Sequence, residues 1–231
     1  MTIERQPSPP ESQPPSPENR ASSRSSFWQR LWQAQKSNIQ TIAIAILLAV
    51  LIRLFIAEPR FIPSDSMVPT LQVGDRLVVE KVSYRFHSPR VGDIVVFEPP
   101  QQLQVFGYTN DQAFIKRVIG VPGQTLQVQN HVIYRDGQPL AESYIAEPPD
   151  YEIEPFQVPA GQYFVMGDNR NNSNDSHVWG FLPEENIIGR AVFRFWPWTR
   201  VEAIRSPAAD LALVAPPRAQ AASTRQSVSF Q

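Results

Sequence analysis

The sequence contains no cysteine and only three histidines among its 231 residues. The missing cysteine excludes disulfide bonds, thiolate metal sites and cysteine nucleophiles. The three histidines do not have the spacing of zinc ligands, so we expect no metal and no cofactor. The net charge is −1 and the isoelectric point about 6.3, whereas nucleic-acid binding usually requires a basic domain. The absences therefore favour a protein without a metal, a cofactor or a nucleic-acid partner.

Large apolar residues are scarce at both ends of the chain. Residues 1–25 are rich in proline, serine and glutamate, and such a segment cannot bury enough surface to offset the entropy of ordering. Aromatic residues at helical spacing follow from Phe27 to Trp32, which indicates an interfacial segment. We therefore expect residues 1–37 to form a disordered tail that ends in an interfacial segment. Residues 206–231 are rich in alanine, proline, serine and glutamine, which predicts a second flexible tail.

One long apolar run stands out, at residues 38–57. At 1.5 Å per residue, the stretch from Ile39 to Ala57 is just long enough to cross a hydrocarbon core about 30 Å thick. Arg53 lies near its end, where the side chain can reach the headgroups. A buried helix of a soluble protein is the alternative, but the polar tail before the run offers nothing to pack against. We predict a transmembrane helix.

Basic residues precede this run at positions 20, 24, 30 and 36, and they set its predicted orientation. The positive-inside rule then places the N-terminus in the cytoplasm and residues 58–205 on the extracytoplasmic side. The host could be a plasma membrane, or a thylakoid membrane with the domain facing the lumen.

Residues 58–205 show alternating apolar and polar positions with frequent turn signals, and no amphipathic helix. The pair Asp136-Gly137 is a hairpin signal, and the VGD triplets at 73–75 and 91–93 predict turns. The pattern predicts an all-β domain. The expected strands lie within 76–86, 93–100, 113–120, 125–140, 162–168 and 189–198.

The segment PSDSMVPTL, at residues 63–71, contains two candidate nucleophiles, Ser64 and Ser66. A serine hydroxyl needs a base within hydrogen-bonding reach to attack a carbonyl. Without such a base, the same residues would form an ordinary turn leading into a strand.

A candidate base lies in the apolar strand AFIKRVIG, at residues 113–120. Lys116 and Arg117 are consecutive in a strand, so one of them should face inward. Burial disfavours the charged form of a lysine and lowers its pKa, which suits a general base near neutral pH. A solvent-exposed edge lysine is the plainer alternative.

The polar stretch GDNRNNSNDSHVWGFLP, at residues 167–183, predicts a structured loop, and long loops on a β scaffold often carry function. His177 follows Asp175 by two residues, so a Ser66–His177–Asp175 triad is a second arrangement to consider. A calcium loop is disfavoured, because the carboxylates are too few and wrongly spaced.

Taken together and in this order, the apolar run, PSDSMVPTL, VGDIVVF, KRVIGVPGQ and GDNRNNSNDSHVWGFLP resemble the type I signal peptidases. The resemblance covers roughly residues 40–200. It implies a membrane-anchored serine endopeptidase that removes signal peptides from exported preproteins after small residues, in an Ala-X-Ala pattern. The implied partners are preproteins and the lipid bilayer, and no oligomeric state is implied.

The resemblance also implies roles for individual residues. Ser66 is expected to be the nucleophile and Lys116 the general base, with Ser64 contributing to the oxyanion hole. Ser173 is expected to orient the Lys116 amine. The site is expected to be supported by three charged residues, Arg117, Asp168 and Asp175.

Two positions depart from the family pattern. His177 stands where an arginine commonly pairs with the loop aspartate, which makes one supporting ion pair weaker or pH-dependent. Asp65 lies between the two serines, where a small residue is frequent, and its charge would either disturb the oxyanion hole or face solvent.

Two other function classes fit parts of this pattern. Self-cleaving transcriptional repressors use a related serine/lysine site, but they need a DNA-binding helical domain at the N-terminus. A membrane-anchored β domain that only binds envelope partners would share the fold without the chemistry. Cleavage of a preprotein that depends on Ser66 separates the enzyme from such a binding domain.

Overall fold

A computed structural model describes residues 38–105, 107–109 and 111–205 of the chain. The tails that we predicted at 1–37 and 206–231, with the interfacial aromatic segment, lie outside the described residues. Two compact units, residues 1–51 and 52–231, divide the chain and are described separately.

The described part of the first unit belongs to the helix Asn38–Phe55, which is long and apolar enough to cross a membrane. Its 18 residues span about 27 Å at 1.5 Å per residue. The apolar side chains of this helix are exposed, as lipid-facing side chains would be. We expected the span to continue to Ala57, but the helix ends at Phe55 because Ala57 pairs with Glu80 in the first strand.

The second unit contains a larger sheet of eight strands, in the order β1-β2-β11-β3-β4-β9-β10, with β12 pairing with β11. All of the pairings are antiparallel. The strands are β1 Ala57–Phe61, β2 Arg76–Glu80, β3 Ile94–Phe97, β4 Phe114–Gly120, β9 Gln162–Met166, β10 Leu182–Pro183, β11 Ile187–Trp196 and β12 Glu202–Ala203.

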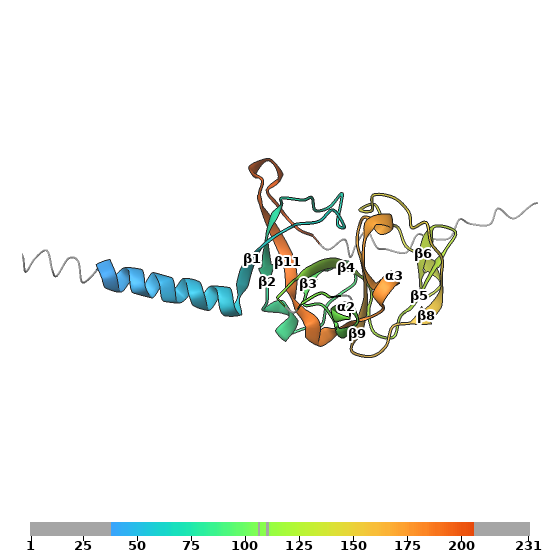
Figure 1. The fold of residues 1–231 in the computed structure, drawn as a ribbon, viewed down its shortest axis with the longest axis horizontal. Helices are drawn as coiled ribbons and strands as arrows, with labels where there is room; N and C mark the ends of the chain where they lie inside the picture. Colours follow the sequence, from blue (N-terminus) through green and yellow to red (C-terminus); the bar gives the residue numbers. More distant parts are fainter. Residues whose placement is uncertain (1–37, 106, 110, 206–231) are drawn as a thin grey trace, which may run out of the picture. The chain divides into compact units, whose positions relative to one another are not determined.

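A smaller sheet of four strands, in the order β7-β6-β5-β8, lies at the opposite end of this unit from β1 and β2 (Figure 1). The Asp136-Gly137 turn connects β6 to β7, and both residues have positive φ, 51° and 75°, as a tight hairpin requires. These strands are β5 Thr125–Gln129, β6 Val132–Arg135, β7 Gln138–Pro139 and β8 Ile153–Gln157.

The fold is mostly β, as predicted, and the helices described within residues 57–205 have three or four residues each. The α-helices are α2 Gln101–Gln104 and α3 Ser176–Trp179, and the 3-10 helices are Ser83–Arg85, Arg170–Asn172, Glu184–Asn186 and Trp198–Arg200. The predicted strand at 76–86 is shorter than expected, because the chain turns into the first 3-10 helix after Glu80.

The core is continuous across β4, whose side chains pack into three apolar clusters. Ile115 belongs to a cluster with β2 and β3, Val118 to one with β3 and β9, and Ile119 to one with the smaller sheet. We expected only one of Lys116 and Arg117 to face inward. Both are buried, because β4 lies in the middle of the sheet with apolar packing on both faces.

Candidate active site

The segment that carries Ser64 and Ser66 is held by buried apolar residues. Met67 and Leu71 pack into the same cluster as Ile62, and the Leu71 N–H donates to the Met67 carbonyl at 2.9 Å. The Ser66 carbonyl accepts a hydrogen bond from the Asn169 N–H at 3.0 Å. Ser66, only 7% exposed, is therefore fixed to both the core and the 167–175 loop.

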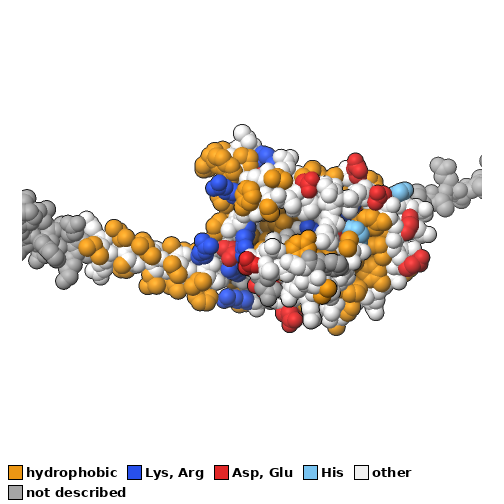
Figure 2. All heavy atoms as spheres, viewed as in Figure 1, with side chains coloured by type: hydrophobic (Ala, Val, Ile, Leu, Met, Phe, Trp, Pro, Cys, Tyr) orange, Lys and Arg blue, Asp and Glu red, His pale blue; other side chains and the backbone are white. Residues whose placement is uncertain are grey.

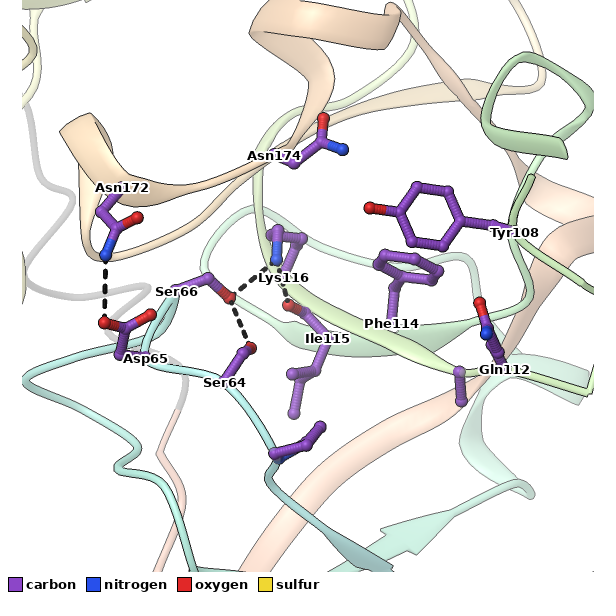
Figure 3. A pocket seen from close by; sticks show the side chains of 12 residues that line it. Ser64, Asp65, Ser66, Tyr108, Gln112, Phe114, Ile115, Lys116, Asn172 and Asn174 are labelled. Atoms are coloured by element: carbon purple, nitrogen blue, oxygen red, sulfur yellow. Dashed lines mark hydrogen bonds between the residues drawn. The ribbon is translucent and has the colours of Figure 1, made fainter. Parts of the chain in front are cut away.

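Lys116 reaches Ser66 across 50 positions of sequence (Figure 3). Its Nζ donates to Ser66 Oγ at 2.8 Å and to the Ile115 carbonyl at 3.1 Å. In β4, Lys116 lies opposite Val95 of β3 and is 4% exposed. The strand therefore delivers a buried amine directly to the serine hydroxyl.

Burial lowers the pKa of Lys116 to about 8, although the charges of Asp175 and Asp168 act in the opposite direction. Removing an ammonium from water disfavours its charged form, and no carboxylate contacts the amine directly to compensate. At pH 7, roughly a tenth of the amines would be neutral and able to accept a proton.

Ser64 is exposed and lies beside Ser66, with the two Oγ atoms 3.4 Å apart. At this distance the hydrogen bond is weak. Ser64 Oγ therefore lies on the solvent side of Ser66, whereas Lys116 approaches from the buried side (Figure 3).

Ser173 does not make the contact with Lys116 that we expected. Its Oγ is buried and has no hydrogen-bond partner among the described residues. A Cβ atom placed on Gly167 would collide with both Ser173 Oγ and the Ser66 carbonyl, so Ser173 and the Ser66 segment pack against the same side of Gly167. An orienting role for Ser173 stays a prediction.

Arg117, which follows Lys116 in β4, forms a bidentate ion pair with Asp168. Arg117 Nε and Nη2 donate to the Asp168 carboxylate at 2.7 and 2.6 Å, and the side chains are 1% and 0% exposed. Arg117 also donates to the Gly92 carbonyl and stacks on the Tyr144 ring. The pair links β4 to the start of the 167–175 loop.

Asp175 caps the short helix α3 and holds the same loop. One of its carboxylate oxygens accepts from the Gly167 N–H at 2.8 Å, and the other accepts from the His177 N–H and Nδ1. The His177 ring stacks on Tyr151, with the ring centres 4.3 Å apart. His177 therefore pairs with Asp175, as the alternative triad requires, but the hydroxyl of Ser66 is paired with Lys116 and Ser64.

A second buried ion pair escaped the sequence analysis. Arg170 donates to the Glu142 carboxylate through both Nη atoms at 2.7 Å and to the Gly167 carbonyl through Nε at 2.9 Å. Tyr144 also donates to Glu142. In the sequence, Arg170 was recognisable only as a charged residue in the polar stretch after Gly167. Glu142 gave no sequence signal for this pair, because it lies in an irregular segment.

Asp65 faces away from the Ser66 hydroxyl (Figure 3). Its carboxylate accepts a hydrogen bond from Asn172 Nδ2 at 3.0 Å, and its backbone carbonyl accepts one from Asn169 Nδ2 at 3.3 Å. Asp65 is exposed, so the structure favours a role in fastening the serine segment to the 3-10 helix Arg170–Asn172.

A cleft of about 620 Å³ opens over Ser66 and Lys116, and Tyr108, Phe114 and Asn174 are among the residues that line it. In β4, pairing with β9 begins at Arg117, so within the described residues Phe114–Lys116 pair only with β3. The backbone beside the cleft thus has an open edge. Within residues 38–105, 107–109 and 111–205, no three His, Asp or Glu side chains are grouped to hold a metal ion.

Comparison with known proteins gives a consistent family assignment. The family model described as signal peptidase, peptidase S26, matches residues 35–196. The probable signal peptidase I-1 of Synechocystis sp. is 67% identical over 169 residues, which cover 73% of this chain and 86% of that protein. Signal peptidase I of Leptolyngbya laminosa is 55% identical over 169 residues, covering 73% and 83%.

A plant protein is also similar. The probable thylakoidal processing peptidase 2 of Arabidopsis thaliana, a chloroplast protein, is 49% identical over 160 residues, which cover 69% of this chain and 44% of that protein. The family match spans more than half of the chain and includes Ser66, Lys116 and the 167–175 loop. The chain belongs to the signal peptidase family, peptidase S26.

Proposed function

We propose that this protein is a membrane-anchored serine endopeptidase that removes signal peptides from exported preproteins, with Ser66 as nucleophile and Lys116 as general base. The observation that carries the proposal is the 2.8 Å contact between Lys116 Nζ and Ser66 Oγ in a buried site. Family membership and the signal peptidase names of the relatives support the same activity.

The acylation step follows from this contact. The neutral amine of Lys116 takes the hydroxyl proton as Ser66 Oγ attacks the carbonyl carbon before the cut. The resulting tetrahedral intermediate carries a negative oxygen. The Ser66 backbone N–H and the Ser64 hydroxyl would stabilise this oxygen, because donors fixed in a partly dry cleft act strongly on developing charge.

The remaining steps use the same proton. The Lys116 ammonium gives it to the leaving amine as the peptide bond breaks, which leaves the signal peptide esterified to Ser66. Water then attacks the ester with Lys116 again as base, and the enzyme returns to its starting state. Ser173 would orient the amine during this cycle, and Arg117, Asp168 and Asp175 would hold the surrounding backbone in place.

An extended peptide fits the open backbone beside the cleft. The acyl half of the substrate would lie as an added strand between residues 62–66 and 111–115. Small residues would occupy the first and third positions before the cut. The apolar surface of Ile62, Val96, Ala113 and Ile115 would contain the third side chain, whereas the Ala-X-Ala preference itself comes from the family resemblance.

The proposed location follows from the helix Asn38–Phe55, which would anchor the enzyme where preproteins emerge from the bilayer. The N-terminus would be cytoplasmic and residues 58–205 extracytoplasmic, in a plasma membrane or facing a thylakoid lumen. The similarity to a thylakoidal processing peptidase supports a thylakoid membrane, and the similarity to bacterial signal peptidases supports either membrane.

Cleavage of a purified preprotein with an Ala-X-Ala site tests this function. We expect Ser66→Ala and Lys116→Ala each to lose at least about a thousandfold in kcat/KM, because each removes a participant in the chemistry. His177→Ala should keep most of the activity. Loss of activity in His177→Ala with retention in Lys116→Ala would instead support the Ser66–His177–Asp175 triad, and no cleavage by the wild type would support a binding domain.

A further inference from the structure

Glu58 and Arg60 of β1 and Ile62, the residue that follows β1, alternate along the segment that leads to Ser66. Alternate residues of a strand share a face, so these three side chains point the same way. Ile62 is buried, and Arg60 is 35% exposed. Phe61, on the other face, is 57% exposed. The charged side chain of Arg60 therefore projects to the same side of the segment as the buried side chain of Ile62.

A second pocket, of about 300 Å³, is lined by Arg60 and Ile62, together with Pro59 and Phe61 of the same segment. It shares Ala113, Phe114 and Ile115 with the cleft over Ser66, so the two form one continuous groove. Among the residues that line this pocket, Arg60 alone is charged, and it is further from Ser66 along the chain than the apolar Ile62 and Pro63. The groove thus changes from apolar to charged with distance from Ser66.

The charges at this far part do not cancel. Arg60 donates from Nε to Glu58, and Lys81 Nζ lies 2.6 Å from the other oxygen of the same carboxylate. Two cations therefore share one anion, which leaves one net positive charge. Figure 2 shows Lys and Arg side chains gathered over this end of the larger sheet, with acidic side chains among them.

We propose that Arg60 determines specificity for the fifth residue before the cut, favouring an acidic side chain over a basic one. The inference rests on the proposed function, in which the third residue occupies the apolar part of the groove beside Ile62. Arg60 lies two residues before Ile62 on the same strand face, so it meets the substrate side chain two positions further from the cut. The fourth side chain of an extended peptide points to the opposite face.

The experiment measures kcat/KM of the full-length enzyme in detergent for a set of preproteins that all keep Ala at the first and third positions. The fifth residue is Ala, Glu or Lys, and a parallel set varies the fourth residue in the same way. For the wild type, we expect Glu to exceed Lys about three- to tenfold at the fifth position, the range of a partly exposed ion pair. The ratio should approach one in high salt.

Variants of the enzyme identify the residue responsible. Arg60→Glu should reverse the Glu-to-Lys ratio at the fifth position. The carboxylates at positions 58 and 60 then outnumber the single cation, Lys81, and leave a net negative charge. Arg60→Gln should bring the ratio close to one. This variant tests the proposal even if Arg60→Glu fails to fold. Arg76→Glu is the matched control, since Arg76 lies on the neighbouring strand outside both pockets and should leave the ratio unchanged.

A ratio near one in the wild type, a ratio unaltered by both Arg60 variants, or equal ratios at the fourth and fifth positions would each overturn the proposal. The substrate with Ala at the fifth position separates this outcome from failure of the proposed function. If the wild type cleaves that substrate and Ser66→Ala does not, the peptidase assignment stands whatever the ratios show.

Discussion

At the scale of single residues, the proposed chemistry depends on one amine that the fold keeps away from water. Lys116 lies on a central strand with apolar packing on both sides, and its only hydrogen-bond partners among the described residues are Ser66 Oγ and a carbonyl. Burial lowers its pKa to about 8. The same burial that makes the amine a usable base therefore works against folding when the amine is charged.

Lys116→Met should stabilise the protein while abolishing cleavage. The folded-state pKa of about 8 is below the usual value of about 10.4, so charging the buried amine opposes folding. Wild-type stability should rise with pH between these values. At pH 7 we expect Lys116→Met to raise the free energy of unfolding by about 1–3 kcal/mol. Chemical denaturation at pH 7 and pH 10 checks this, with a smaller difference at pH 10; a variant less stable than the wild type at pH 7 would contradict it.

The sequence allowed the two catalytic residues to be proposed but could not bring them together. The local pattern around Ser66 fits a turn equally well, and its base is 50 positions away. Alternation in the strand predicted that either Lys116 or Arg117 faces inward. The burial of both depends on which strands flank β4, which is a property of the sheet order and not of the local sequence.

At the scale of elements, β4 and the 167–175 loop together hold the proposed catalytic residues. Arg117 joins the strand to Asp168 at the start of the loop, and Asp175 ties the end of the loop back to Gly167. Arg170 holds the same glycine through its carbonyl. Buried charged side chains therefore connect β4 and the 167–175 loop around the segment that carries Ser66.

Asp168→Asn tests this element directly. The change leaves Arg117 buried without an opposite charge, which should lower the free energy of unfolding by about 3–5 kcal/mol. Glu202→Gln is the matched control: that carboxylate also pairs with a buried arginine but is 59% exposed, so its loss should be less than about 1 kcal/mol. Thermal and chemical unfolding of both variants give the comparison, and equal losses would show that burial of the ion pair is not the deciding factor.

Elements with a strong local signal were predictable, and those defined by distant partners were not. The Asp136-Gly137 hairpin forms as its turn chemistry predicts. By contrast, β8 has an irregular apolar pattern and exists because it pairs with β5. The Arg170–Glu142 pair joins the 3-10 helix Arg170–Asn172 to an irregular segment 28 positions away, and neither has a periodic pattern that predicts the contact.

At the scale of the whole molecule, the proposal requires the peptidase domain to lie on the side of the membrane where preproteins emerge. The helix Asn38–Phe55 has the length to span the bilayer, and Ala57 enters the larger sheet two residues after it ends. The domain therefore begins almost directly after the helix.

The absence of native cysteine allows the predicted orientation to be tested by labelling. In sealed right-side-out vesicles of a plasma membrane, a membrane-impermeant maleimide should label Gln129→Cys, an exposed position of β5. Ser12→Cys, in the N-terminal tail, should be labelled only after the membrane is permeabilised. The reverse pattern would place the domain in the cytoplasm and contradict the proposed location.

The identity of the general base is tested most directly by the pH dependence of kcat/KM for a preprotein whose cleavage region lacks ionisable groups. With Lys116 as base, kcat/KM should rise about tenfold per pH unit below a single ionisation near the pKa of about 8 and then level off. The same ionisation should persist in His177→Ala. A rise centred near pH 6.5, the ordinary pKa of histidine, that disappears in His177→Ala would contradict the account.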